Sequence, residues 1–404
     1  CYADGSTLFV RHGREAMTEE IRRFADAKEA EAFGRFSDWL EQLYTAEMRS
    51  YIDTNIDSPL DLIKPWRDGL AILKMGGFGK LDRKVASFFD DQRLQQIFSF
   101  QSMYAGLAPY EALAIYAVIT YMDSVQGVFV PEGGMHQMAA GLAEAVEKAG
   151  VTIRYSSPVS HIVRHTNGSI RGVRLGTGEG SELVEADAVV CNPDLPVAYR
   201  ELLGDVEAPK KARTGKYSPS CLLWVAGVNG LPPQDASHHN IHFGQDWDGS
   251  FKALIEDGVR MPEPSIHVTL HSLDDPSLAP EGSTSIYVLE PTPNLSGTID
   301  WSRERDRIMG SLREKVASLG YPTDVVVEEI YDPQDWERMG MEQGTPFALA
   351  HTFFQTGPFR PNNVDKRVPG LVFTGASTLP GVGVPMGVVS GLLAAERGGG
   401  WGGG

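Results

Sequence analysis

The sequence predicts an α/β protein with a second, strand-rich α+β region, and three observations indicate this class. Residues 370–396 read as an apolar strand, a glycine-rich turn and a helix. Residues 133–155 read as a helix followed by a strand, and residues 217–330 contain several short strands interrupted by one helix. Alternating helices and strands favour an α/β fold, whereas clustered strands favour an α+β region.

The composition is that of a globular protein and argues against several classes. The 404 residues include 36 Lys and Arg against 53 Asp and Glu, a formal charge of −17 that argues against a nucleic-acid-binding protein. Three widely spaced cysteines, Cys1, Cys191 and Cys221, predict no disulfide framework and favour a reducing cytoplasm. The longest apolar run, at 112–122, is about half the roughly 20 residues that a membrane-spanning helix needs.

Residues 1–125 are expected to be mainly helical. The chain starts without Met and soon reaches a strand-like segment at Gly5–Val10, as the middle of a longer protein would. Apolar residues recur at helical spacing from 18 to 54, and an aromatic-rich helical segment covers 86–122. Between them, residues 62–84 mix Trp66 and aliphatic residues with six basic and two acidic residues, a local charge of +4.

Residues 126–205 alternate between helix and strand. A helix from Met135 to Ala149 is followed by Gly150 at a C-cap position. After it we expect a strand at 151–155 and a hairpin at 159–175 that turns at Asn167-Gly168 with type I′ geometry. A strand at 183–191, ending in an apolar run, is expected to be buried at the centre of a sheet.

Residues 206–355 are expected to form a mixed sheet with one helix at 302–319. Three histidines, His238, His239 and His242, form a cluster in this region. Because no carboxylate or thiol ligand completes a metal site, we expect a polar sheet edge there and no metal. The strands are expected at 221–228, 266–270, 285–289 and 325–330.

Residues 370–396 carry the strongest chemical signal. A strand at 371–374 leads into a loop with Gly375, Gly381 and Gly383, and then into a helix at 386–396. Such a loop brings the backbone and a helix N-terminus close to a cofactor, although an ordinary turn with structural glycines has the same pattern. The fingerprint G-x-G-x-x-G occurs only in the Gly-rich tail at 398–404, where no strand precedes it.

Several segments resemble one family when they are taken together and in order. They are Phe98–Met103, Gly127–Met135, Ala186–Asp194, Leu349–Gln355 with Phe359–Asn362, and Gly375–Ser390. In these segments the chain resembles the bacterial-type phytoene desaturases, which are FAD-dependent carotenoid desaturases related to the flavin amine oxidases. The resemblance runs from about Cys1 to Arg397.

The resemblance implies a domain organisation. Residues 126–205 and 356–397 would form an FAD-binding Rossmann-like domain, residues 206–355 an α+β substrate domain, residues 1–125 a helical region facing substrate and membrane, and residues 398–404 a flexible tail. Family members begin with a βαβ unit that carries the pyrophosphate-binding loop, and this sequence starts after that unit. The chain is therefore expected to be N-terminally truncated and, alone, to bind FAD weakly or not at all.

The resemblance also implies which residues contact FAD. Val159 would touch the adenine through its backbone, and Asn192 would lie near the cofactor at a strand end. Gly375 and Ala376 would lie by the ribityl-phosphate region. Gly381 and Gly383 complete the loop, Val384, Pro385 and Met386 would lie over the isoalloxazine edge, and the amides of Met386 and Gly387 would face the pyrimidine part of the flavin.

A carotenoid hydrocarbon substrate requires an apolar tunnel. Candidate lining residues are Phe100, Gln101, Tyr104, Tyr116 and Phe353, although any single aromatic could simply belong to the core. By resemblance, the flavin takes a hydride while a proton leaves the neighbouring carbon, and the electrons then pass to a quinone or oxygen. No residue stands out as the catalytic base.

The basic apolar segment at 62–84 suits peripheral docking on the membrane that holds the substrate, with Lys64, Lys74, Lys80 and Lys84 at the headgroups. A solvated helix and loop is the alternative.

For the function, three alternatives stay open. The chain could act on a downstream carotenoid as a desaturase, ketolase or isomerase, it could be another amine oxidase of the superfamily, or it could be an inactive fragment unable to hold FAD.

Overall fold

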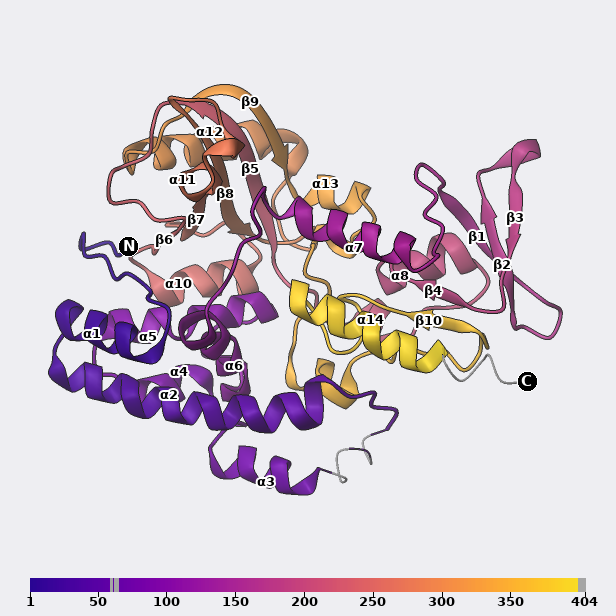
Figure 1. Cartoon of the computed structure of the whole chain (residues 1–404), viewed down its shortest axis with the longest axis horizontal. Coiled ribbons are helices and arrows are strands. Elements are labelled where there is room, and N and C mark those ends of the chain that lie inside the picture. The colour runs from indigo at the N-terminus through magenta and orange to yellow at the C-terminus, as the bar shows by residue number, and fades with distance from the viewer. Residues whose placement is uncertain (59–60, 62–64, 399–404) are drawn as a thin grey trace.

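A computed structural model describes residues 1–58, 61 and 65–398, and it contains a helical region, a five-stranded sheet and an α/β region (Figure 1). The helical region and the sheet lie at one end of the molecule, and the α/β region lies at the other. Each of the three has its own buried apolar cluster. No helix in the described ranges is long and apolar enough to cross a bilayer.

The helical region begins with two helices, α1 (Arg14–Phe24) and α2 (Ala27–Glu47), where the periodicity predicts one. The break lies at Asp26, whose carboxylate accepts a hydrogen bond from the Glu29 amide at 2.8 Å and so caps α2. The segment at 86–122 is helical only in short pieces, because Gly106 adopts a left-handed conformation and interrupts it. After α2, the helical region contains η1 (Met48–Ile52), α3 (Trp66–Lys74), α4 (Leu81–Ala86), α5 (Gln92–Ile97), η3 (Phe100–Ala105), η4 (Ala114–Tyr116), α6 (Ala117–Tyr121) and η5 (Met122–Gln126).

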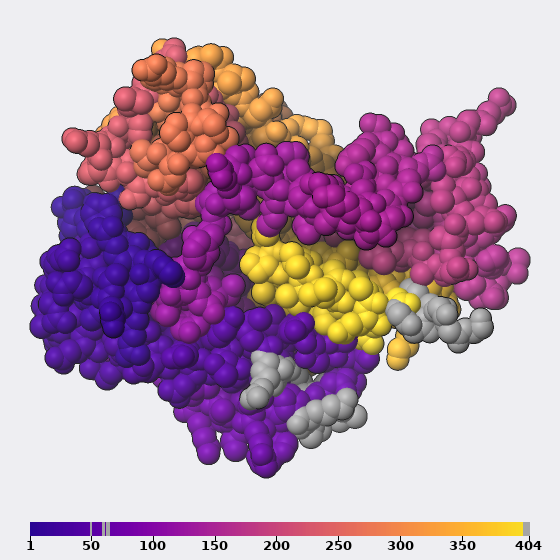
Figure 2. Space-filling model, in the orientation of Figure 1, coloured from indigo at the N-terminus to yellow at the C-terminus, as the bar shows by residue number. Residues whose placement is uncertain are grey.

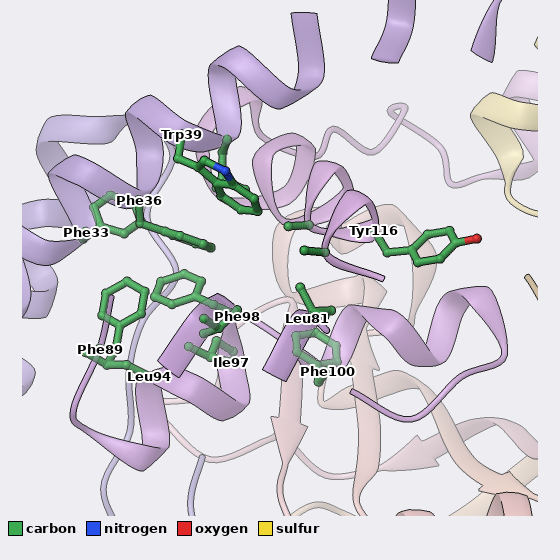
Figure 3. Packing of buried hydrophobic residues seen from close by; sticks show 14 of the residues in the cluster. Phe33, Phe36, Trp39, Leu81, Phe89, Leu94, Ile97, Phe98, Phe100 and Tyr116 are labelled. Atoms are coloured by element: carbon green, nitrogen blue, oxygen red, sulfur yellow. The ribbon is translucent and has the colours of Figure 1, made fainter. Parts of the chain in front are cut away.

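The short turns pack on α2 through an aromatic core (Figure 3). The Phe33 and Phe98 rings stack at 5.6 Å between centroids, and the Phe89 and Phe98 rings at 5.0 Å. Each fully buried phenylalanine contributes roughly 1.5–3 kcal/mol. Packing of this kind holds segments that are too short to be stable as isolated helices.

The five-stranded sheet is antiparallel in the order β6-β7-β8-β5-β9. Its long helix α12 (Trp301–Ser318) buries Ile308, Leu312 and Val316 in the same apolar cluster as the strands. The expected strands and helix are present here with small differences in their bounds. The region contains β5 (Ser220–Asn229), β6 (His239–His242), α10 (Trp247–Lys252), η8 (Ala253–Asp257), β7 (Ile266–Leu270), α11 (His271–Asp274), η9 (Pro276–Leu278), β8 (Ser283–Thr292), β9 (Asp324–Tyr331) and α13 (Pro333–Arg338).

The α/β region combines a three-stranded antiparallel sheet with a parallel pair, β4 (Val189–Cys191) and β10 (Leu371–Phe373). Helix α14 (Val384–Gly398) follows β10, as the sequence predicts. The other elements are α7 (His136–Lys148), β1 (Val159–Arg164), β2 (Ile170–Leu175), η6 (Gly178–Gly180), β3 (Glu182–Glu185), α8 (Leu195–Val197), η7 (Ala198–Leu203), α9 (Lys210–Thr214), η10 (Glu342–Gly344), η11 (Phe353–Gln355) and η12 (Gly357–Phe359).

Four details of the predicted strands are wrong. Residues 5–10 and 151–155, all among the described residues, form no strand. The predicted strand at 183–191 is divided between β3 and β4, which belong to different sheets. The hairpin at 159–175 is present, but only Gly168 of its turn has a positive φ, whereas a type I′ turn needs two such residues.

A further difference concerns burial in the α/β region. The predicted buried strand around β4 is exposed on one face, where Val190 is 57% accessible. The apolar face of α7 is also exposed, with Met138, Leu142 and Val146 at the surface. Along α14, Val388 and Leu392 are exposed as well. The apolar patterns of these elements are therefore correct, but within the described residues nothing covers them.

Candidate functional site

The two parallel strands end side by side and bring two predicted cofactor residues together. Asn192 follows β4, and Gly375 lies just beyond β10. The Asn192 side-chain amide donates to the Thr374 carbonyl at 3.3 Å. A Cβ atom on Gly375 would lie 2.7 Å from the Asn192 Nδ2 atom, and Gly375 has a φ of 99°. Only glycine fits here, at the carboxyl ends of strands where ligands of α/β sheets bind.

The loop at 375–383 is anchored by a buried arginine, Arg360. Its guanidinium donates to the carbonyl oxygens of Ala376 at 2.6 Å and Thr378 at 2.9 Å, and also to those of Leu349 and Gln355. Burial lowers the pKa of Arg360 to about 10, so the group stays a cation at neutral pH. Arg360 thus joins two segments of the predicted motif, although sequence reasoning assigned it no role.

A half-buried carboxyl, Asp194, anchors the same loop through Ser377. It accepts hydrogen bonds from the Ser377 hydroxyl at 2.6 Å and from the Glu342 amide at 2.8 Å. Burial raises the pKa of Asp194, and the Ser377 hydrogen bond opposes this shift. Asp194 lies two residues after Asn192, so one strand end supplies both a loop anchor and a cofactor candidate.

The imidazole of His351 packs directly against Gly381, and a Cβ atom at Gly381 would overlap it. His351 Nε2 accepts a hydrogen bond from the Val382 amide at 3.4 Å. The Tyr116 hydroxyl donates to the His351 carbonyl at 2.7 Å, and its ring points away from the aromatic core (Figure 3). Burial holds the pKa of His351 well below its usual range, so the ring is neutral.

The N-terminal end of α14 completes the loop. Gly383 has a φ of 115°. The Ser390 hydroxyl of α14 accepts a hydrogen bond from the Gly375 amide at 3.0 Å, which joins the start of the loop to this helix. The Gly387 amide donates to the Gly383 carbonyl at 2.8 Å, so this predicted flavin-facing amide is engaged within the helix. Glycine backbone, an exposed Val384 and a helix N-terminus fit the edge of a flavin.

A cavity of about 1300 Å³ lies between the helical region and the five-stranded sheet (Figure 2). Of the predicted substrate residues, Phe100, Gln101 and Tyr104 line it. Tyr116 and Phe353 are not among its lining residues. Phe353 instead packs against Phe354 and Phe359 in the segment between η10 and β10, with ring centroids 5.1 and 5.8 Å away.

The opposite wall of the cavity carries the predicted polar sheet edge, because β6 is an edge strand. Its histidine rings stack in a row, His238 on His239 at 4.8 Å and His239 on His267 at 4.9 Å. Burial lowers the pKa of His239 to about 4 and that of His267 to about 3, so both are neutral at pH 7. The parts of the chain that the structure describes hold no group of three or more His, Cys, Asp or Glu side chains placed to bind a metal.

The cavity also contains an acidic residue, Asp123, to which the sequence analysis assigned no role. Asp123 lies in η5 and faces the cavity beside Gln101 and Tyr104. Burial raises its pKa to about 6, against a partial lowering by the Gln101 side chain. The only signal in the sequence is a single acid directly after the apolar run at 112–122.

Taken together, a parallel strand pair, a glycine loop and a helix N-terminus define a flavoprotein-type oxidoreductase site. The fold itself is shared with a solved structure. An oxidoreductase from Methanosarcina mazei superimposes with a TM-score of 0.53 at 15% identity, over 83% of this chain and 72% of that one.

Residues 11–397 match the family of flavin containing amine oxidoreductases, and the chain belongs to that family. It is 42% identical to a phytoene dehydrogenase of Streptomyces griseus, over 98% of this chain and 77% of the relative. It is 36% identical to a zeta-carotene-forming phytoene desaturase of Myxococcus xanthus, over 95% of this chain and 74% of the relative. The resemblance to the carotenoid desaturases is thus confirmed, and the chain is an FAD-dependent oxidoreductase of the type that acts on CH–CH bonds.

Proposed function

We propose that this protein desaturates phytoene or a similar acyclic carotenoid precursor. The observation that carries the proposal is the 1300 Å³ cavity, one side of which presents Phe100 and Tyr104 together with apolar residues of the N-terminal segment. A hydrocarbon has no polar handle, so a site for it must exclude water and bind by apolar contact. The names of the relatives, phytoene dehydrogenase and phytoene desaturase, support the same substrate class.

In the proposed reaction a saturated carbon pair loses two hydrogens. FAD bound against the 375–383 loop would supply the acceptor for a hydride from one allylic carbon, a proton would leave the neighbouring carbon, and a carbon–carbon double bond would form between them. The two electrons would then go to a quinone or to oxygen. Product formation in anaerobic assays with and without an added quinone separates these two acceptors.

The test expresses the holoprotein in cells that accumulate colourless phytoene and records the visible spectrum of the extracted pigments. New polyene bands support the proposal, and their wavelengths count the double bonds introduced. A colourless extract from a flavin-loaded protein contradicts it. Conversion of a supplied downstream carotenoid in that case would point to a later step of the same chemistry.

We further propose that a βαβ unit with a pyrophosphate-binding loop completes an FAD-binding domain formed by residues 126–205 and 356–397. The uncovered apolar faces of α7 and α14 and the exposed Val190 of β4 support this. The test compares bound flavin, from the absorbance near 450 nm, for the chain alone and for the chain joined to a family-type N-terminal unit. Stoichiometric flavin on the chain alone contradicts the proposal.

Peripheral membrane docking through α3 is also part of the proposal. Trp66, Leu70 and Leu73 follow one another at helical spacing, and Trp66 and Leu73 are 57% and 59% exposed. Helix α3 lies at the periphery of the molecule (Figure 1), where an apolar stripe can enter a headgroup layer.

The basic residues contribute less to this surface than the sequence suggests. Lys80 donates to the Glu111 carbonyl at 2.8 Å, and Lys84 lies over the Trp39 ring at 4.9 Å, so both have partners within the protein. Lys64 lies outside the described residues. We therefore assign the docking mainly to the apolar stripe, with Lys74 at its end.

Flotation with liposomes of mixed anionic and neutral lipids tests the surface. The variant Trp66→Ser/Leu73→Ser should lose most of the bound fraction, whereas Val326→Ser/Val327→Ser, which alters exposed apolar residues of β9, should keep it. Equal flotation of both variants contradicts docking through α3.

A further inference from the structure

His351 joins the flavin loop, residues 375–383, to one wall of the cavity, and its backbone forms one half of this junction. The His351 amide donates to the Ala105 carbonyl at 2.8 Å, and its carbonyl accepts from the Tyr116 hydroxyl at 2.7 Å. Ala105 is the last residue of η3, the turn whose Phe100 and Tyr104 line the cavity. The position of His351 is therefore fixed relative to the apolar side of the cavity.

The imidazole of His351 forms the other half of the junction, because it contacts the flavin loop. A Cβ atom on Gly381 would lie only 2.1 Å from the His351 Cε1 atom, so the ring and the Gly381 backbone are in direct contact. The Nε2 atom accepts a hydrogen bond from the Val382 amide at 3.4 Å, and the Nδ1 atom lies 3.5 Å from the Thr356 hydroxyl oxygen. Since Nε2 is an acceptor, the proton of the neutral ring is on Nδ1.

The environment of the ring keeps this acceptor available. His351 is 8% exposed, and burial together with the positive charge of Arg360 holds the pKa of His351 well below its usual range. A protonated ring could not accept from the Val382 amide and would place a second cation near Arg360. The neutral imidazole is thus the form that holds the flavin loop.

The two segments that meet at His351 are also closely packed. Gly106, the residue after Ala105, has a φ of 74°, and a Cβ atom there would lie 3.1 Å from the Ala350 Cβ atom. Ala350 and the Tyr116 side chain are both buried. Because a close-packed interior transmits displacements, a change in the His351 ring displaces the flavin loop relative to η3.

We propose that His351 is a positioning residue for the desaturation, a role that rests on the proposed function. Its backbone holds it against η3, and its ring holds the flavin loop at a set distance from the cavity wall. It acts through the loop and requires no contact with the substrate. Hydride transfer requires reacting atoms about 3–3.5 Å apart, and a displacement of about 1 Å can cost about 10²-fold in rate.

A histidine that only filled space would respond differently to substitution from one that positions the loop. His351→Leu keeps a similar volume but cannot accept from the Val382 amide. His351→Gln can bring its Oε1 atom to about the place of Nε2 and so keeps the acceptor. A space-filling histidine should therefore tolerate His351→Leu, whereas a positioning histidine should tolerate His351→Gln better.

The first test uses the flavin-loaded holoprotein without substrate and measures flavin content and the visible circular dichroism of the bound flavin. Both variants should keep most of their flavin. The dichroism should shift in His351→Leu and return to the wild-type spectrum in His351→Gln. The matched control His165→Leu, at an exposed position of the 159–175 hairpin, should match the wild type. Wild-type dichroism in His351→Leu, or loss of flavin from both variants, overturns the proposal.

The second test measures turnover of phytoene. His351→Leu should lower kcat by about 10–10²-fold with KM unchanged, because only the geometry of the transition state is lost, and His351→Gln should recover most of the rate. Reduction of the bound flavin by dithionite needs no substrate positioning and should be equally fast in all variants. A wild-type kcat in His351→Leu overturns the proposal, and so does an equal loss of dithionite reduction.

The Tyr116 hydroxyl allows a check from the other side of the junction. Tyr116→Phe should lower kcat by about fivefold, and its combination with His351→Leu should add no further loss, because both act through one junction. Fully additive losses overturn the proposal. If no carotenoid reacts with the wild-type holoprotein, the proposed function fails by itself, and the dichroism still decides whether His351 holds the flavin loop.

Discussion

Replacing Asp123 by asparagine should stabilise the protein at alkaline pH. The folded-state pKa, about 6, lies above the ordinary value of 3.8, so the fold favours the protonated carboxyl. The folded state therefore loses stability as the pH rises from about 4 through 6. The difference corresponds to about 3 kcal/mol above pH 7, at ~1.4 kcal/mol per pKa unit. At pH 5 the same relation leaves only about 1.6 kcal/mol.

Urea unfolding of Asp123→Asn and the wild type, followed by tryptophan fluorescence, measures this difference at pH 8 and pH 5. The variant should gain about 2–3 kcal/mol at pH 8, since some of the penalty is relieved by water in the cavity, and roughly half of that at pH 5. Asp306→Asn, whose carboxyl is exposed, should show no such difference. An equal gain at both pH values, or no gain at all, would refute a desolvated carboxyl at this position.

Three further substitutions test other parts of the structure. Gly381→Ala should reduce bound flavin about tenfold or more, because the residue has a φ of 140° and its new methyl group meets His351, and adding His351→Ala should restore part of the loss. Arg260→Met should cost about 3–5 kcal/mol in urea unfolding, because it leaves the fully buried Glu290 without its two-point partner, and the double variant with Glu290→Leu should recover most of this. Phe98→Ala should cost about 3–5 kcal/mol, and a value below 1 kcal/mol would show that the aromatic core collapses around it.

The local sequence pattern was sufficient to predict the strands of the five-stranded sheet and its helix. The strand predicted at 266–270 has the bounds of β7, and the helix predicted at 302–319 differs from α12 by one residue at each end. Both have strong periodicity and clear turn residues at their ends. The segment expected to be helical at 86–122 is helical only in short pieces, because its apolar residues lie on all sides. Such a segment satisfies helical spacing, but here it folds into short turns buried against α2.

The candidate site was predictable only where strand topology determined it. Asn192 and Gly375 follow two apolar strands, and parallel pairing brings their ends together. Arg360 and His351 were not recognisable, because their role depends on carbonyl oxygens and glycines of the 375–383 loop and not on a local motif. Asp123 was missed because a single acid after an apolar run has no meaning until the cavity is known.

The loop that would hold the flavin lies in a positive electrostatic potential that the protein's own groups create. Arg360 remains a cation at neutral pH because its pKa is about 10. Its hydrogen bonds go to backbone carbonyl oxygens, whose dipoles offset only part of its charge. The N-terminal end of α14 adds the positive end of a helix dipole at the other side of the loop. Asp194, the nearby acid, is engaged with Ser377 and Glu342, and burial raises its pKa. A flavin that gains two electrons carries more negative charge than an oxidised one, so a flavin bound at this loop would be favoured in its reduced state.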